Sequence, residues 1–398
     1  MTSTKRARLD DGVNGDSGQL ARVELKLRKE EAIEMPSEIG AISAIAAFHQ
    51  AKSRFEDTRS SADDSVIQGV QTQIVVATDA GYVALVHEDG TRTVLDSSGN
   101  PAIQRLLAMA PSDASAFRPG LIPDVVAGDS DGRVTVFTMG RMISRSTVSA
   151  PVSALALDNN PNTPRSFIVG DMSGTITESH VQGILWRTQL STAASDTPGA
   201  TGTGITSVCS VRFADDHGIP TSYVLAASEG NHVQLLARGH PVLTVPISAR
   251  CNCMCSGRFI GRNGLSDDAQ NKETQALLGD DSGRLYVLDN FKIEPYAHLD
   301  YPVTSVVAIP LRALVGRDGP DVVVCGTRSN MIYMLHAKQI LGAFAADFWP
   351  AAIDVIVPSS PEMHSVIAIA ENKAVGIQNP CVLHKVAMIF KDIESNAD

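Results

Sequence analysis

Residues 124–137 read DVVAGDSDGRVTVF, and residues 276–288 read ALLGDDSGRLYVL. Each stretch has an apolar run, a small residue, a polar turn that ends in Gly, and then an alternation of polar and apolar residues. This pattern predicts a β-hairpin, because Gly or Asn in the turn tolerates the positive φ that a tight turn requires. The same pattern occurs in IVVATDAGYVALV (74–86), FIVGDMSGTITES (167–179), YVLAASEGNHVQLL (223–236), DVVVCGTRSNMIYML (321–335) and VIAIAENKAVGI (366–377).

The hairpins recur at regular intervals along the chain. Their small residues are Ala77, Gly128, Gly170, Ala227, Gly279, Gly326 and Ala370. A repeat of roughly 50 residues without helical periodicity is typical of a β-propeller. We therefore predict an all-β fold, a single seven-bladed β-propeller of four-stranded antiparallel blades. Each repeated stretch is expected to supply strands b and c of one blade.

Alternating runs rich in small residues precede most hairpins and are expected to form the innermost strands. They are IGAISAIAAF (39–48), VSALALD (152–158), ITSVCSVRF (205–213), VTSVVAIP (303–310) and AAIDVIVP (351–358). Small side chains suit the crowded centre of a propeller. GILWRTQL (183–190) and PVLTVPI (241–247) follow their hairpins and are expected to be outer strands. The run AIQRLLAMA (102–110) could form a helix, and only its position assigns it to an inner strand.

Closure of the ring is predicted from the two chain ends. LARVELKLR (20–28) alternates and is expected to be the outer strand of the seventh blade, which would tie the termini together and remove free edges. CVLHKVAMIF (381–390) is the alternative for the same place. The predicted domains are a disordered tail at 1–18, the propeller at 19–378 and a C-terminal extension at 379–398.

Composition narrows the class of protein. The chain has 33 Lys and Arg against 44 Asp and Glu, a net charge of −11, which disfavours nucleic acids and anionic membranes as partners. No apolar stretch approaches the roughly 20 residues that span a bilayer, and the polar N-terminus lacks a secretory signal. The six cysteines lie mostly in apolar strands. We expect a cytoplasmic protein with reduced thiols that neither binds nucleic acid nor inserts into a membrane.

The run Cys251-Asn252-Cys253-Met254-Cys255 raises the question of a metal site. Structural zinc usually takes a Cys-x₂₋₄-Cys pair together with a second pair. Here the alternate spacing within a strand is expected to project all three thiols to one face, where Cys behaves as a small apolar residue. No nearby Cys or His pair supplies a fourth ligand. We predict a packed core and no metal.

The acidic turns 129–132 and 280–283 invite comparison with calcium loops. A calcium site needs about six to eight oxygen ligands. Here a hydrophobic strand follows the Gly directly, so the number of ligands falls short. The chemistry of hairpin turns explains these aspartates, and we expect no bound calcium.

No catalytic motif and no cofactor-binding residues are recognised, and the ten histidines are scattered. We therefore expect no enzymatic activity and no cofactor. Phe348 and Trp349 form the one aromatic cluster outside a regular strand, on the connection into the seventh blade. They are a candidate protein-interaction site, expected on the face that carries the b–c turns. Packing between blades is the alternative.

Three segments carry a family resemblance. They are FRPGLIPDVVAGDSDGRVTVF (117–137), RFADDHGIPTSYVLAASEGNHVQLL (212–236) and GRDGPDVVVCGTRSNMIYML (316–335). With a polar turn before the apolar run, they resemble degenerate FG-GAP-type propeller repeats of the group that contains the integrin-alpha FG-GAP repeat-containing protein two and kaptin. The propellers of the Bardet–Biedl complex are similar as well. WD40 repeats match in architecture alone, since their Gly-His and Trp-Asp dipeptides are absent.

The resemblance implies a non-catalytic scaffold or adaptor within a cytosolic, hetero-oligomeric complex of protein subunits. Nutrient or growth signalling, with recruitment to organelle surfaces through partners, is the role it implies first. A ciliary cargo-coat subunit of the Bardet–Biedl type is a second possibility. A third is a small-ligand-binding or enzymatic propeller that uses the central channel. The integrin-type calcium loop Asp-x-Asp-x-Asp-Gly is absent, so the resemblance carries over no ion-binding residue.

Overall fold

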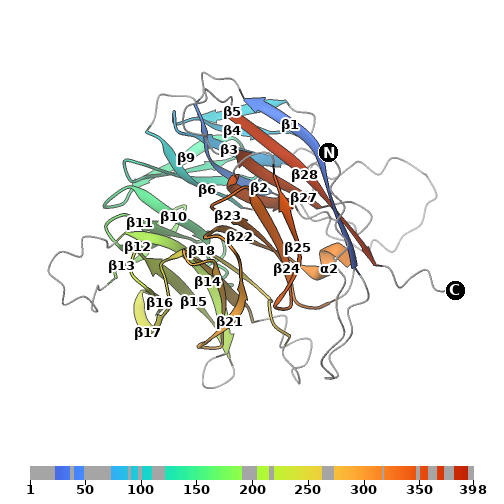
Figure 1. The fold of residues 1–398 in the computed structure, drawn as a ribbon. Helices are drawn as coiled ribbons and strands as arrows, with labels where there is room; N and C mark the ends of the chain where they lie inside the picture. The colour runs from blue at the N-terminus through green and yellow to red at the C-terminus, as the bar shows by residue number, and fades with distance from the viewer. Residues whose placement is uncertain are drawn as a thin grey trace, which may run out of the picture.

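The structure is a computed structural model, and most of its described residues are in β-strands (Figure 1). The described residues are 23–35, 40–48, 73–87, 91–96, 101–109, 122–190, 204–214, 219–261, 273–315, 318–346, 350–356, 365–371 and 381–392. Within these ranges the only helix is the short α2 (Leu311–Val315). No helix among the described residues is long and apolar enough to cross a membrane.

Six antiparallel sheets, blades 1 to 6 in chain order, each consist of four consecutive strands. Blade 1 consists of β2 (Ile42–Phe48), β3 (Gln73–Thr78), β4 (Val83–Val86) and β5 (Arg92–Asp96). Blade 2 consists of β6 (Ile103–Met109), β7 (Asp124–Asp129), β8 (Arg133–Thr138) and β9 (Arg141–Thr147). Blade 3 consists of β10 (Val152–Leu157), β11 (Phe167–Asp171), β12 (Thr175–His180) and β13 (Gly183–Gln189). Blade 4 consists of β14 (Ile205–Ala214), β15 (Pro220–Ser228), β16 (His232–Ala237) and β17 (His240–Pro246). Blade 5 consists of β18 (Cys251–Gly257), β19 (Gln275–Asp280), β20 (Arg284–Asp289) and β21 (Lys292–His298). Blade 6 consists of β22 (Val303–Ile309), β23 (Val322–Thr327), β24 (Met331–His336) and β25 (Gln339–Ala345).

A further four-stranded sheet, the closing sheet, is assembled from both ends of the chain. Its order is β26 (Pro350–Ile356), β27 (Ser365–Glu371), β28 (Cys381–Asp392) and β1 (Val23–Met35), with every pair antiparallel. Figure 1 shows the blue β1 beside the red β28. Because β26 contacts both β22 and β2, the closing sheet lies between blades 6 and 1 and completes the ring.

The prediction of a seven-bladed propeller is wrong: the structure has six blades, and the closing sheet completes the ring. Six blades contain the predicted b–c hairpin, whereas the described part of the stretch 366–377 is the second strand of the closing sheet, β27, which pairs with β28. Its third strand is β28, from the segment expected to extend beyond the propeller. The 12-residue β28 pairs along the whole of β1, so it satisfies more backbone groups than the short end of the predicted hairpin could. The N-terminal strand does lie at the outer edge, and the predicted tail at 1–18 is outside the described residues.

The innermost strands share one irregularity. In all seven sheets the ladder between the first and second strands shifts register around the second residue of the inner strand, which marks a β-bulge. The bulged residues are Ser43, Gln104, Ser153, Thr206, Asn252, Thr304 and Ala351. A bulge leaves its extra residue out of the ladder and re-aims its side chain. Each inner strand therefore presents one residue that its own blade does not pair.

The hydrophobic core lies between neighbouring blades, because each sheet packs its faces against the next. Between blades 4 and 5, for example, Leu225 and Leu235 pack with Leu278 and Leu288, all of them fully buried. The small residue of the second strand permits this close approach. A Cβ on Gly170 would lie 2.5 Å from Ile205 Cγ2 at the start of the next inner strand.

Candidate interaction site on the turn face

The b–c turns and the connections into the inner strands lie at the same end of the blades, which we call the turn face. In blades 1 to 6, the first residue after the second strand donates its amide to the carbonyl that precedes the inner strand. Asp281 N–H thus reaches Arg250 O at 2.9 Å, and Arg328 N–H reaches Pro302 O at 2.8 Å. The same bond recurs at Asp79, Ser130, Met172 and Glu229. This repeated clamp holds the turn face in a fixed geometry.

Buried aspartates at the ends of second strands organise the acidic turns. Asp280 Oδ1 accepts the backbone amides of Ser282 at 2.9 Å and Arg284 at 2.8 Å, while its Oδ2 accepts the Ser248 hydroxyl at 3.2 Å. Asp129 and Asp171 accept amides from their own turns in the same way. These carboxylates are therefore used to hold the hairpin turns through hydrogen bonds to backbone amides. Among the described residues, no group of three or more His, Cys, Asp or Glu side chains could hold a metal ion.

The cysteine run does not project to one face as predicted. Cys251 packs in the core between blades 4 and 5, whereas Cys253 and Cys255 pack toward blade 6. The physical reason is the bulge at Asn252, which breaks the alternation between the first thiol and the other two. Burial raises the pKa of Cys251 to about 12 and that of Cys253 well above its usual range, so these thiols stay protonated. They act as small apolar residues of the core.

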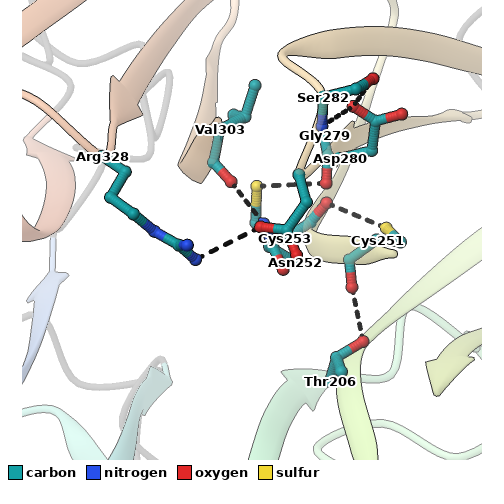
Figure 2. Close-up of polar contacts among 10 residues, drawn as sticks. Thr206, Cys251, Asn252, Cys253, Gly279, Asp280, Ser282, Val303 and Arg328 are labelled. Carbon is teal, nitrogen blue, oxygen red and sulfur yellow. Dashed lines mark hydrogen bonds and ion pairs between the residues drawn. The ribbon is translucent and has the colours of Figure 1, made fainter. Parts of the chain in front are cut away.

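Three of the bulged residues connect neighbouring blades. Thr206 Oγ1 donates to Cys251 O at 2.6 Å, and Asn252 Nδ2 donates to Val303 O at 3.0 Å, each carbonyl belonging to the next inner strand (Figure 2). Ser43 Oγ makes the equivalent bond to Ile103 O at 2.5 Å. The sequence did not predict this role. Its only sign is a polar residue in second place on several inner strands.

At blades 5 and 6, the bulged residue Asn252 also belongs to a group of hydrogen-bonded side chains at the surface. Asn252 Nδ2 also donates to Asp281 Oδ1 at 2.7 Å, and the same oxygen accepts Arg328 Nη2 at 3.2 Å. Arg328 is 62% exposed, and Tyr301, on the adjoining connection, is 42% exposed. We call Asn252, Asp281, Tyr301 and Arg328 the rim cluster. Tyr and Arg are the side chains most often found at binding hot spots.

The structure describes one of the two tryptophans of the chain, Trp186, but not Trp349. Phe348 and Trp349 lie outside the described residues, so their role as an interaction site stays a prediction. Trp186 is half-buried, and its indole N–H donates to the Glu178 carboxylate. Its ring lies against the turn of the next blade, where a Cβ on Gly239 would come within 2.9 Å of Trp186 Cε3. Trp186 therefore packs blade against blade.

Comparison with known proteins identifies the fold. No family model matches the chain, and no curated protein matches it. The WD40 β-propeller domain of Doa1 is similar, with a TM-score of 0.59 and 10% identity over 93% of this chain and 98% of that one. U3-55K has a TM-score of 0.58 and 10% identity, over 91% of this chain and 98% of that one. BBS1N in complex with ARL6DN has a TM-score of 0.58 and 8% identity, over 91% of this chain and 96% of that one. These likenesses confirm a β-propeller, and the more specific FG-GAP resemblance stays a prediction.

Proposed function

We propose that this β-propeller is a non-catalytic scaffold or adaptor that binds other proteins through its turn face. The observation that carries the proposal is the rim cluster. Arg328 and Tyr301 are exposed, and the Arg328 guanidinium donates to Asp281, whose carboxylate also accepts Asn252 Nδ2; Asn252 Nδ2 in turn donates to the Val303 carbonyl. A side chain held in place before binding loses less conformational entropy on association, so its contacts contribute more to affinity.

The buried ionisable groups support a role in binding over one in catalysis. Burial raises the pKa of the Cys209 and Cys325 thiols far above neutrality, which keeps them from acting as nucleophiles. The buried Asp321 carboxylate accepts the Arg258 amide at 2.7 Å and so joins blades 6 and 5. These groups are used to hold blades together.

The finer proposal follows the FG-GAP resemblance of the repeats. We place the protein in a cytoplasmic, hetero-oligomeric complex of the type implied by the kaptin group, where it would contact protein subunits and reach organelle surfaces through them. The similar propeller BBS1N was solved in complex with ARL6DN, which supports a binding role for a domain of this shape. The net charge of −11 favours protein partners over nucleic acids.

The test compares three forms of the tagged full chain in affinity purification from native cells. One is the wild type, one carries Tyr301→Ala with Arg328→Ala, and one carries Lys338→Ala. Lys338 is a matched control because it is 41% exposed and ion-paired with Glu294 at 3.0 Å, yet lies at a c–d turn, on the opposite end of the blades. Circular dichroism and size-exclusion chromatography establish that all three are folded.

We expect the wild type and the Lys338→Ala control to retain a stoichiometric protein partner. The rim variant should lose it by at least about tenfold, as expected when hot-spot side chains are truncated. Retention of the partner by the rim variant would show that the turn face is not the binding surface. A wild-type monomer that binds no partner and turns over a small-molecule substrate would overturn the scaffold proposal altogether.

A further inference from the structure

The outer strands of blades 1 to 4 carry a charge opposite to that of the whole chain. We call these strands, with their described turns, the arginine flank, residues 91–96, 138–147, 180–189 and 237–246. The flank contains five arginines and one aspartate, without lysine or glutamate, whereas the chain has a net charge of −11. All five are exposed: Arg92, Arg141, Arg145, Arg187 and Arg238. In blades 5 and 6 the equivalent residues, 289–298 and 336–345, balance two lysines with one aspartate and one glutamate.

Exposed apolar side chains gather on the same flank. Of the twelve large apolar side chains that are exposed among the described residues, seven belong to it. In β9, Met142 is 54% exposed and Ile143 is 49% exposed, and Ile184 and Leu185 of β13 are exposed as well. Exposed apolar groups that lie together among polar residues mark interaction sites, and Met and Arg are both enriched in protein interfaces.

Contacts between blades make the flank one continuous surface. Arg145 Nη2 in blade 2 lies 3.5 Å from Asp96 Oδ2 in blade 1. Val181, in the turn that precedes β13, packs against the core cluster shared by blades 2 and 3. Thr188 Oγ1 of blade 3 donates to Gly239 O, in the turn of blade 4, at 2.5 Å. Strands β9, β13 and β17 accordingly follow one another along the left side of Figure 1.

The positive charge of the flank is largely uncompensated. Its one acid, Asp96, already pairs with Arg145. Arg187 Nε donates to the neutral Thr177 hydroxyl at 3.4 Å. Within the described part of the chain, three arginines of the flank have no carboxylate partner: Arg141, Arg187 and Arg238. Each guanidinium has five N–H donors, so the flank can bind several anionic groups.

Strands β9 and β13 also present a backbone edge. Each is the last strand of its sheet, and no described strand pairs with its outer side. Neither contains proline, whereas β17 contains Pro241 and Pro246. An extended segment of another polypeptide can pair with such an edge. Exposed arginines repel a basic strand and attract an acidic one, so this edge discriminates by charge.

We propose that the arginine flank is a second docking surface, which binds an extended segment of a partner protein that contains both acidic and apolar residues. The segment pairs with the edge of β9. Its carboxylates bind the arginines of the flank, and its apolar side chains cover Met142 and Ile143. This surface lies on the outer edges of the blades and goes beyond the binding site proposed on the turn face.

Charge decides between this occupant and two others. A second copy of the chain that used the same surface would place arginines opposite arginines, which repel one another. An anionic membrane would extend past the flank, and the rest of a chain with a net charge of −11 repels it. A single acidic segment covers the flank alone, because charges farther away than about 10 Å are screened.

The test uses defined probes with the full-length protein. The probes are fluorescein-labelled Glu-Val-Asp-Ile-Glu-Val-Asp-amide, its basic counterpart Lys-Val-Lys-Ile-Lys-Val-Lys-amide, and vesicles of phosphatidylcholine with phosphatidylserine. Fluorescence anisotropy measures peptide affinity, and hydrogen–deuterium exchange locates the bound peptide. The flank variant carries Arg141→Glu with Met142→Ser, at the first two positions of β9. The matched control carries Lys292→Glu with Ile340→Ser, exposed residues at the first position of β21 and the second position of β25.

We expect the acidic peptide to bind saturably and to slow amide exchange in β9, while the basic peptide does not bind. The flank variant should lose affinity by at least about tenfold, and the control should bind as the wild type does. Absence of binding, equal binding of both peptides, or unchanged affinity in the flank variant would overturn the proposal. So would binding to vesicles without binding to the peptide, or a dimer in size-exclusion chromatography that the flank variant dissociates.

Failure of this proposal is separable from failure of the turn-face proposal. The variant with Tyr301→Ala and Arg328→Ala should bind the acidic peptide as the wild type does. If it loses the peptide, the site lies on the turn face and the flank proposal is wrong, while the turn face keeps its role. If the protein captures no partner through the turn face but binds the peptide along β9, it is the turn-face proposal that fails.

Discussion

At the residue scale, the small residue of each second strand decides how closely two blades approach. A Cβ on Gly279 would lie 2.7 Å from Val303 Cγ1 and 2.9 Å from Cys253 Sγ. A Cβ on Gly128 would meet Val152 Cγ1 at 2.4 Å. In both cases the nearest atom belongs to the first residue of the inner strand of the next blade. The small residue therefore serves blade-to-blade packing, separately from the turn that follows it.

Gly279→Ala should destabilise the protein by about 1–3 kcal/mol, because the added methyl group overpacks the interface between blades 5 and 6. The measurement is urea unfolding, with a lower midpoint at an unchanged m-value. Gly261→Ala is the matched control, because a Cβ there meets nothing within 4 Å. Its effect should stay within about 0.5 kcal/mol. Equal stability of the two variants would show that the interface can absorb a methyl group.

At the element scale, the bulge of the inner strand makes a polar residue a tie between blades at Ser43, Thr206 and Asn252. Thr206→Val should cost about 1–2 kcal/mol, because the Cys251 carbonyl loses the donor at 2.6 Å. Thr304 occupies the same position in β22, but its buried hydroxyl has no hydrogen-bond partner among the described residues. Thr304→Val should therefore be neutral or stabilising. Thermal unfolding of both variants measures the difference, and comparable losses would contradict the role assigned to the bulge.

The closing sheet predicts an asymmetry between the two chain ends. Strand β28 lies between β27 and β1, so its removal breaks two ladders, whereas removal of β1 breaks one. A chain that ends at residue 380 should aggregate or unfold at a lower temperature than a chain that begins at residue 36. Size-exclusion chromatography and thermal unfolding of the two truncations test this. A β1 deletion that is the less stable of the two would contradict the observed strand order.

At the scale of the whole molecule, one half-buried carboxylate links the closing sheet to blade 1. Asp354 Oδ2 accepts the Ala47 amide at 2.7 Å, from β26 to β2. Burial is the main influence on this group and raises the pKa of Asp354 to about 6, which outweighs the amides of Ala47 and Val355. In the unfolded chain the pKa of an aspartate lies near about 4. Folding thus favours the protonated form of Asp354.

The sign of the pH dependence follows from this difference. Between about pH 4 and pH 6 the folded protein binds more protons than the unfolded chain, so the stability contributed by Asp354 falls as pH rises. The loss is roughly 2–3 kcal/mol and is complete above about pH 6. Asp354→Asn should remove it, since the amide oxygen can still accept the Ala47 N–H. The measurement is the difference in unfolding free energy between wild type and variant from pH 3.5 to 7.5. A difference that does not change with pH would contradict the raised pKa.

The sequence predicted local structure well where a single hairpin carries the signal. The turn glycines Gly132, Gly174 and Gly283 do adopt positive φ, and in blades 1 to 6 the hairpin lies where the apolar run and the turn placed it. It failed where long-range pairing decides the outcome. The third strand of the closing sheet comes from 381–392, and no local pattern shows that this segment would pair with residues 23–35. The candidate site was missed for the same reason, since Arg328 of blade 6 reaches Asp281 of blade 5 across the blade boundary, and Asn252 and Asp281 are 29 residues apart in the sequence.

The sequence by itself determined the repeating blade, because alternation and turn chemistry act over a few neighbouring residues. It also determined the overall charge and so the kind of partner that is disfavoured. Only the tertiary structure decided how the ring closes and which face each cysteine takes. These features depend on a one-residue bulge and on contacts between distant segments. Such contacts are set by the packing of whole sheets, which no short stretch of sequence contains.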